Sequence, residues 1–363
     1  MKNKSVIFFF GTKAQFIKTK PVLSNLNSLG VDIKIIDTCQ HVETTKLQLQ
    51  NLKFQFEYKS LSNNKSDIST LLQMLKWFIS LVIKILFSKR EKMQHQICLI
   101  HGDTASTLLG VIWAKINKVK IVHIESGWRS NNLFKPFPEE LIRHISEKFA
   151  NVLIPDGKKQ FDNIKKYENK KTIIPIDLNT NYDSLLQNLK TSDIQSKNLI
   201  VAIHRTENIY NSKSLNQLME LLIHVQKDSI FSSIDWYCHQ PTLKILKKKN
   251  YYEKLISSGI KMFNLIEYSE FVQKIYNSKA VLTDGGGVAK ETALLNIPLV
   301  IWRQKIGTDH QYENLFNVLI SNYNNEKIMK FFNEIDDNLL RTLPKHDSPS
   351  QKISKELFNF MKL

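Results

Sequence analysis

The chain of 363 residues has only three cysteines, Cys39, Cys98 and Cys238, which lie far apart with no paired spacing. This scarcity excludes a disulfide framework, and it predicts buried, reduced thiols in a cytoplasmic protein. Histidine, cysteine and acidic residues also show no cluster with the spacing of metal ligands, so no metal site is predicted.

Long apolar runs are absent as well. The start, MKNKSVIFFFGTK, has a basic head but an apolar core shorter than a secretory signal needs. The stretch 67–90 is strongly apolar with one narrow polar stripe, yet it is short and charged for a bilayer span. Two interpretations stay open. The stretch is a helix buried under a sheet, or its surplus apolar surface and the basic residues up to 92 contact an anionic membrane or a partner chain.

Acidic residues are outnumbered, with 34 Asp plus Glu against 51 Lys plus Arg and a net charge of +17, which favours anionic partners. The basic residues are scattered, and neither a nucleic-acid motif nor a run of arginine and aromatic residues is present, so no nucleic-acid partner is predicted. The hydrophobic content of 42% is typical of a globular protein, and the length predicts two domains.

Three acidic positions cluster around one βαβ pattern. Two apolar runs, 97–100 and 120–124, each lead to a carboxylate, Asp103 and Glu125, and a helical segment separates them. Glu139 opens the next helix. Consecutive strands of a βαβ unit are parallel neighbours, and ligands bind beyond their carboxyl ends. We therefore expect these acids to share a cleft and transfer protons. The alternative is that the acids cap the helices they precede.

The second half of the chain repeats the alternation of strands and helices. The polar stretch 177–197 marks the boundary between the halves. The predicted domains are 1–180 and 181–349, with a C-terminal helix at 350–363 as a candidate for packing back on the first domain. Both are expected to be α/β domains with parallel sheets that face each other across a ligand cleft.

The glycine run Gly285-Gly286-Gly287 lies between a strand and a helix, where backbone amides can approach a diphosphate. His204, Arg205 and Arg303 follow neighbouring strands and would neutralise the remaining charge. Glu291, further along the helix, would accept hydrogen bonds from ribose hydroxyls. A tight turn without a ligand, and a core histidine at 204, are the alternatives.

A weaker anion signal follows the first strand. Gly11 lacks the companion glycines of a dinucleotide fingerprint. Lys13 and Lys18 add positive charge beside the N-terminus of the next helix, which strengthens the signal.

In combination and in this order, the motifs resemble those of the UDP-N-acetylglucosamine 2-epimerase family over most of the chain. The segments that carry the resemblance are Gly11-Thr12-Lys13, Lys18, Pro21, Gln40-His41, His101-Gly102-Asp103-Thr104, His123-Ile124-Glu125-Ser126-Gly127-Trp128-Arg129, Pro138-Glu139-Glu140, Arg143, His204-Arg205-Thr206-Glu207-Asn208, Thr283-Asp284-Gly285-Gly286-Gly287, Glu291 and Arg303. The resemblance implies the glycosyltransferase-B (GT-B) fold, two Rossmann-like domains that hold the sugar in the first and UDP in the second, and a homodimer. It implies a reaction without a cofactor, in which UDP is eliminated across C1 and C2 and added back after C2 is protonated from the opposite face.

The resemblance also implies roles for single residues. Asp103, Glu125 and Glu139 match the catalytic acids of the family. His204 matches an essential histidine near the diphosphate. The positions assigned to substrate binding are Lys13, Lys18, Arg143, Arg205, Gly285, Gly286, Gly287, Glu291 and Arg303.

Other positions depart from the family pattern. Gln40, Arg205 and His239 match part of a second UDP-sugar contact set in the non-hydrolysing members, and Gln40 and His239 are the candidate regulatory residues. Glu43 and the loop 63–66 do not match this set. The serine usual before the glycine pair is Gly285 here, which removes a hydroxyl aimed at phosphate. The departures lie around the UDP phosphates and the regulatory set, and the three acids are unchanged.

The predicted function is that of a cytoplasmic, homodimeric UDP-N-acetylglucosamine 2-epimerase. It would interconvert UDP-N-acetylglucosamine (UDP-GlcNAc) and UDP-N-acetylmannosamine (UDP-ManNAc), or a related UDP-2-acetamido sugar, for surface polysaccharide synthesis. A hydrolysing 2-epimerase is one alternative. A GT-B glycosyltransferase with a membrane-associated acceptor is another, favoured by the stretch 67–90 and the net charge. A protein that binds a nucleotide sugar without converting it is the third.

Overall fold

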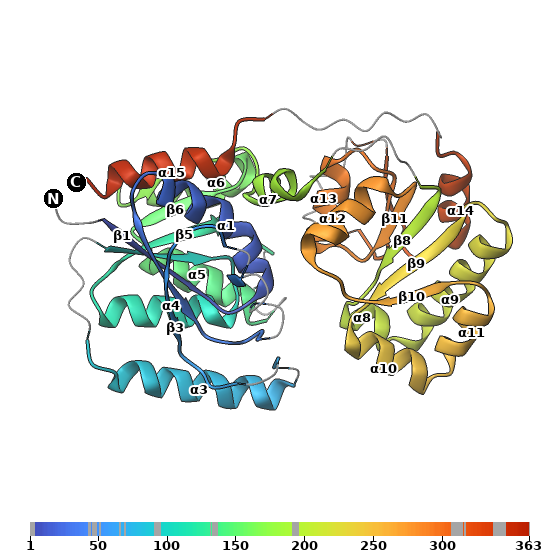
Figure 1. Ribbon diagram of the computed structural model, residues 1–363, viewed down its shortest axis with the longest axis horizontal. Coiled ribbons are helices and arrows are strands. Elements are labelled where there is room, and N and C mark those ends of the chain that lie inside the picture. Colours follow the sequence, from blue (N-terminus) through green and yellow to red (C-terminus); the bar gives the residue numbers. More distant parts are fainter. Residues whose placement is uncertain are drawn as a thin grey trace. The chain divides into compact units, whose positions relative to one another are not determined.

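The computed structural model describes residues 4–42, 45, 49–50, 52–64, 67–68, 70–90, 96–130, 132, 137–190, 196–305, 315, 317–336 and 346–362. The chain folds into two units. One comprises the residues up to Ser184 together with those from Asp347 onward, and the other comprises Leu185–His346. Each unit is built around one parallel sheet with which helices alternate (Figure 1). The predicted α/β class, with a parallel sheet in each half, is confirmed.

The sheet of the first unit has the strand order β3-β2-β1-β4-β5-β6-β7 within the described residues. Its strands are β1 (Ser5–Phe10), β2 (Asp32–Asp37), β3 (Glu57–Ser60), β4 (Gln96–His101), β5 (Lys120–Ser126), β6 (Val152–Pro155) and β7 (Thr172–Ile173). The helices are α1 (Lys13–Ser28), α3 (Leu71–Phe87), α4 (Ala105–Ile116), α5 (Glu139–Phe149), α6 (Lys158–Ile164), the 3-10 turn η1 (Lys165–Tyr167), α7 (Asn181–Asn188), which crosses the boundary between the units, and α15 (Pro349–Phe360).

Strand β1 shows how the sheet is buried on both faces. Val6, Phe8 and Phe10 belong to a core cluster with residues of α1 and α15. Ile7 and Phe9 belong to a second cluster with residues of α3 and α4. Successive side chains of a strand point to opposite faces, so a continuous apolar run is the pattern expected for a parallel sheet covered on both sides.

The C-terminal helix α15 packs on the first unit beside α1 (Figure 1). Ile353 and Leu357 are buried in the same cluster as the apolar side of α1. The Ser354 hydroxyl donates a hydrogen bond to the backbone oxygen of Val22 at 3.2 Å. The last residues of the chain therefore complete one face of the first sheet.

Helix α3 packs against α4 and carries its apolar residues on two sides. Trp77, Leu81 and Ile85 are buried in the core. A second apolar stripe is exposed, with exposed fractions from 49% to 63%, and comprises Leu72, Leu75, Ile79, Ile83 and Leu86. The interpretation of α3 as a wholly buried helix is wrong, and the surplus apolar surface is present. Residues 69 and 91–92 of the predicted contact stretch lie outside the described residues. In the part of the chain that the structure describes, no helix is both long and apolar enough to cross a membrane.

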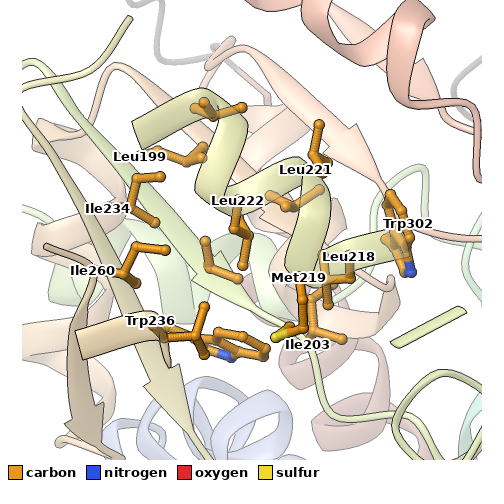
Figure 2. Packing of buried hydrophobic residues seen from close by; sticks show 14 of the residues in the cluster. Leu199, Ile203, Leu218, Met219, Leu221, Leu222, Ile234, Trp236, Ile260 and Trp302 are labelled. Atoms are coloured by element: carbon orange, nitrogen blue, oxygen red, sulfur yellow. The ribbon is translucent and has the colours of Figure 1, made fainter. Parts of the chain in front are cut away.

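The sheet of the second unit has the strand order β10-β9-β8-β11-β12-β13 among the residues described. Its strands are β8 (Asn198–Ala202), β9 (Ser233–Cys238), β10 (Lys261–Asn264), β11 (Ala280–Thr283), β12 (Leu299–Ile301) and β13 (Val318–Ile320). The helices are α8 (Thr206–Ile209), α9 (Ser212–Lys227), α10 (Gln240–Lys248), α11 (Tyr251–Ser257), α12 (Tyr268–Asn277), α13 (Gly286–Leu294) and α14 (Asn325–Asn333). Figure 2 shows the core of this unit, in which Leu218 and Leu222 of α9 pack with Ile234 and Trp236 of β9.

Candidate functional site

Asp103 and Glu125 lie at the carboxyl ends of two adjacent strands. β4 and β5 pair in parallel, and His101 lies opposite Ile124 in their last pair. Asp103 and Glu125 come one or two residues after this pair, so both lie at the same edge of the sheet. Glu125 has a φ of +64°, in the left-handed region that non-glycine residues rarely adopt, and the pairing of β5 with β6 shifts register there. Strained backbone of this kind is concentrated at functional positions, which supports the selection of Glu125.

The Glu125 carboxylate is surrounded by donors from several elements. Lys18 Nζ of α1 lies 2.8 Å from Oε1 and 2.9 Å from Oε2. Asn179 Nδ2 lies 3.1 Å from Oε1, and His101 Nδ1 lies 3.4 Å from Oε2. Burial lowers the pKa of Lys18, but the charge and hydrogen bond of Glu125, together with the charges of Asp156 and Asp103, outweigh it and the pKa is raised. A cation and additional donors favour the ionised form of Glu125, which suits a group that accepts a proton.

Arg143 links Asp103 to the first turn of α5. Its guanidinium forms a salt bridge with Asp103 Oδ2 and donates to Glu140 Oε2 at 2.7 Å. Burial lowers the pKa of Arg143, yet the charge of Asp103 and the contacts with Glu140 raise it overall. Arg143, assigned to substrate binding by the resemblance, therefore already holds two carboxylates in place.

The helix-capping alternative for the acids is wrong. The N-cap of α4 is Thr104, whose hydroxyl accepts from the backbone N–H of Thr107 at 3.3 Å. The N-cap of α5 is Pro138, which makes no side-chain cap bond. Glu139 lies in the first turn of α5, and its buried Oε2 accepts no hydrogen bond from the residues that the structure describes.

Lys13 and Gln40, two further predicted site residues, also belong to the first unit. Lys13 is the first residue of α1, whose N-terminus is anchored by Gln15. The Gln15 amide donates to the backbone oxygen of His101 at 2.8 Å, which ties the start of α1 to the end of β4. Gln40, selected for the candidate regulatory set, is buried and accepts from the Ser106 hydroxyl at 3.0 Å.

In the second unit, Asp284 organises the anion site. Its carboxylate is fully buried directly after β11. Oδ2 accepts from the backbone N–H groups of His204 at 2.9 Å and Arg205 at 2.6 Å, and from Asn208 Nδ2 at 3.2 Å. These bonds fix the loop after β8 against the glycine run. Asp284 is not among the predicted site residues, although an aspartate between an apolar strand and a glycine run is a recognisable signal.

Two guanidinium groups converge on Gly285. A methyl group added to this glycine would lie 3.3 Å from Arg205 Nη2 and 3.5 Å from Arg303 Nε. Gly285 is the N-cap of α13, and its φ of +120° is open to glycine and strained for other residues. Two like charges at a helix N-terminus create a site for a multiply charged anion, which favours ligand binding over a bare turn.

His204 and Glu291 flank this anion site. The His204 side chain is 40% exposed and its ring lies 4.9 Å from that of His239, so the core-histidine alternative is wrong. Glu291 is buried in α13 and accepts from the Tyr268 hydroxyl at 2.8 Å. Burial first, and then the charge of Glu291, raise the pKa of Tyr268 well above its ordinary value. Tyr268 thus stays a donor that orients the Glu291 carboxylate.

Replacing Gly285 with alanine is expected to lower the free energy of unfolding by about 1–3 kcal/mol, because the side chain is strained at this φ and meets Arg205. We also expect weaker binding of UDP, since the guanidinium groups must move. Gly287→Ala is the matched control for stability, because a methyl group there meets Glu291 Oε1 at 3.9 Å, an ordinary contact. Urea unfolding and calorimetric titration with UDP measure both effects. Equal stability of the two variants would contradict the strain at Gly285.

In the described parts of the chain, no group of three histidine, cysteine or acidic side chains could hold a metal ion. The three cysteines are buried and form no disulfide. Two polar residues of the first unit, Asp156 and Asn179, belong to the Glu125 site, although no local pattern in the sequence points to them.

Comparisons with known proteins agree with these observations. A family model described as UDP-N-acetylglucosamine 2-epimerase matches residues 25–353. The chain is 26% identical over 344 residues to the UDP-N-acetylglucosamine 2-epimerase of Methanocaldococcus jannaschii, covering 88% of this chain and 89% of that one. It is 26% identical over 332 residues to the protein of the same name from Campylobacter jejuni, covering 83% and 82%.

Among solved structures, the M. jannaschii UDP-GlcNAc 2-epimerase in complex with UDP-GlcNAc and UDP matches with a TM-score of 0.78 at 23% identity, covering 98% of this chain and 99% of that one. At this identity the likeness concerns the fold, and it confirms the predicted GT-B type.

Proposed function

The chain belongs to the UDP-N-acetylglucosamine 2-epimerase family, and from this premise we propose that it interconverts UDP-GlcNAc and UDP-ManNAc, or a related UDP-2-acetamido sugar, as a step towards surface polysaccharide. The observation that carries the proposal is the set of three acids in the first unit, each in a different environment. Glu125 is paired with an ammonium group, Asp103 with a guanidinium group, and Glu139 has a buried oxygen without a donor among the described residues.

Inversion at C2 needs a proton acceptor and a proton donor on opposite faces of the sugar. In the elimination, the base takes the C2 proton while the C1–O bond breaks and UDP leaves with the electron pair. In the return step, an acid delivers a proton to C2 from the other face and a diphosphate oxygen reattaches to C1. Glu125, held as a carboxylate, suits the acceptor, and Glu139 suits the donor. Arg205, Arg303 and the amides at the start of α13 suit the negative charge of the leaving diphosphate.

Product analysis tests this function. The purified protein is incubated with UDP-GlcNAc, and the products are resolved by proton and phosphorus NMR. UDP-ManNAc with an intact diphosphate linkage supports the proposal. Free N-acetylmannosamine together with UDP indicates the hydrolysing reaction. Unchanged UDP-GlcNAc together with tight binding of UDP would contradict the epimerase and favour a glycosyltransferase. The family match across residues 25–353 weighs against that last outcome.

For the quaternary structure, we propose a homodimer in which a second copy covers the exposed stripe of α3. Leu75, Ile79 and Ile83 recur at spacings of four residues, as in paired helices, and they are about half exposed. Lys84, next to this stripe, donates to the backbone oxygen of Leu61 at 2.7 Å and is thus directed at its own unit rather than at a lipid headgroup. The predicted membrane contact remains the alternative occupant of this surface.

Ile79→Asp is expected to weaken the dimer at least about tenfold, because it buries a charge at the centre of the stripe. Ser80→Asp is the matched control, since Ser80 is exposed on the adjacent polar side of the same helix. Light scattering behind size-exclusion chromatography measures the mass across a dilution series. A wild-type monomer that sediments with anionic vesicles would contradict the dimer and support the membrane contact.

A further inference from the structure

One amide group links two carboxylates at the Glu125 site. Asn179 Nδ2 donates to Glu125 Oε1 at 3.1 Å and to Asp156 Oδ2 at 2.7 Å. Asp156 Oδ1 accepts from the indole N–H of Trp128 at 2.6 Å. Both oxygens of Asp156 therefore accept hydrogen bonds from donors of its own unit, and the residue is buried, with 8% of its surface exposed.

The strand geometry explains how Asp156 reaches this place. It directly follows Pro155, the last residue of β6, and forms an isolated bridge with Ile176. The register shift between β5 and β6 sets Ser126, next to Glu125, opposite Pro155. Trp128 lies three residues after Glu125. Asp156 therefore holds the loop after Glu125 through Trp128, and the Glu125 carboxylate through Asn179.

We propose that Asp156 and Asn179 are positioning residues for the proton transfer at Glu125. They hold its carboxylate in one orientation and balance the charge around it, and they need no contact with the substrate. The proposal rests on the function proposed above, because it assigns the two residues to the acceptor of that reaction.

The charges around Glu125 give the proposal a measurable signature. The titratable groups that act on Glu125 from the described elements at this edge are Lys18 of α1, His101 of β4 and His123 of β5, and Asp103 beyond β4 and Asp156 beyond β6 act on its partner Lys18. Lys18 supplies the positive charge, whereas burial lowers the pKa of His123. Asp156 adds a negative charge close to Glu125, and a nearby like charge disfavours the ionised form. The Asn179 amide lies between the two carboxylates and offsets this repulsion.

Substitutions at the two positions are therefore expected to act in opposite directions. Asp156→Asn removes a negative charge and releases the Asn179 amide for Glu125, and both effects lower the pKa of Glu125. Asn179→Ala removes a donor and leaves two carboxylates facing each other, which raises that pKa. Asn179→Asp is an isosteric change that adds a further carboxylate, and it is also expected to raise the pKa of Glu125. This variant replaces Asn179→Ala in the experiment if the alanine variant does not fold.

The experiment records two readouts against pH for the full chain and each variant. The first is the rate of deuterium exchange at C2 of UDP-GlcNAc. The second is the titration of the Glu125 side-chain carbon by carbon-13 NMR, assigned by its loss in Glu125→Gln, and it requires no activity. Asp162→Asn is the matched control, because Asp162 is exposed on the neighbouring helix α6 and the substitution removes the same charge.

The midpoint of the acid limb in the pH–rate profile and the midpoint of the NMR titration both report the pKa of Glu125. We expect both midpoints to move to lower pH by about one unit in Asp156→Asn, and to higher pH by about one unit in Asn179→Ala. Both variants should lose about 10–100-fold in kcat, because the acceptor is misplaced. Asp162→Asn should match wild type. Midpoints that stay at the wild-type value in both variants would overturn the proposal, even if stability fell. Opposite NMR shifts in a protein without C2 exchange would support the network while contradicting the proposed function.

Discussion

A protein with glutamine in place of Glu125 is expected to exchange the C2 hydrogen of UDP-GlcNAc about 10²–10⁴-fold more slowly than wild type. Glutamine keeps the shape of the side chain, but its amide cannot take the C2 proton. It also leaves Lys18 without its ionic partner at 2.8 Å. Proton NMR of the C2 signal in deuterated water measures the rate, and calorimetric titration measures the binding of UDP.

Binding of UDP should persist in this variant, because the guanidinium groups around Gly285 belong to the second unit. Glu168→Gln is the matched control, since Glu168 is exposed on the surface of the first unit and its substitution should leave exchange unchanged. If Glu125→Gln retained exchange at the wild-type rate, another group would be the proton acceptor.

The second large effect is expected at Asp284. Asp284→Ala removes the acceptor of three hydrogen bonds in a fully buried position. The backbone N–H groups of His204 and Arg205 lose this acceptor, whereas the Asn208 amide still donates to the backbone oxygen of Trp302. A loss of about 2–4 kcal/mol in the free energy of unfolding is expected. Binding of UDP should also fail, because His204 and Arg205 are held in place through these bonds. Urea unfolding and calorimetric titration measure the two effects.

Asp284→Asn is the graded control. Its side-chain oxygen can replace Oδ2 as the acceptor for the backbone N–H groups of His204 and Arg205, so most of the stability should return. Its amide would then face the His204 ring in place of Oδ1. If the alanine variant were as stable as the asparagine variant, the hydrogen bonds of Asp284 would not be what holds the loop.

The sequence allowed the parallel sheets and the sequence positions of the acids to be predicted, because these follow from short-range patterns. A continuous apolar run such as Val6–Phe10 is typical of a strand covered on both faces. A strand, a helix and a second strand imply parallel neighbours, which brings Asp103 and Glu125 to one edge. The glycine run before α13 was likewise visible as a local signal.

Other features depend on contacts between distant residues, which leave no local pattern in the sequence. Asp156 and Asn179 are 23 residues apart, and they meet at Glu125 because of a register shift between two strands and a bridge beyond them. The exposed stripe of α3 is another case. Periodicity showed that the helix is apolar on most sides, but which of those sides lies against α4 is decided by packing.

The ionic and hydrogen-bond partners of the charged residues could also not be predicted from the sequence. The resemblance assigns Arg143 to the substrate, yet the structure joins it to Asp103 and Glu140. A charged side chain finds its partners in three dimensions, and its position in a motif does not reveal them. The same reason explains why Asp284 was recognised only within the glycine motif, although it holds the loop that carries His204 and Arg205.

If the acids of the first unit exchange the C2 proton of a UDP-2-acetamido sugar, one incubation in deuterated water reveals the exchange. Wild-type protein and UDP-GlcNAc are mixed in deuterated water, and the UDP-sugars are recovered and analysed by NMR and mass spectrometry. We expect one deuterium at C2 in the UDP-ManNAc formed. A recovered UDP-sugar that keeps hydrogen at C2 after long incubation would contradict it.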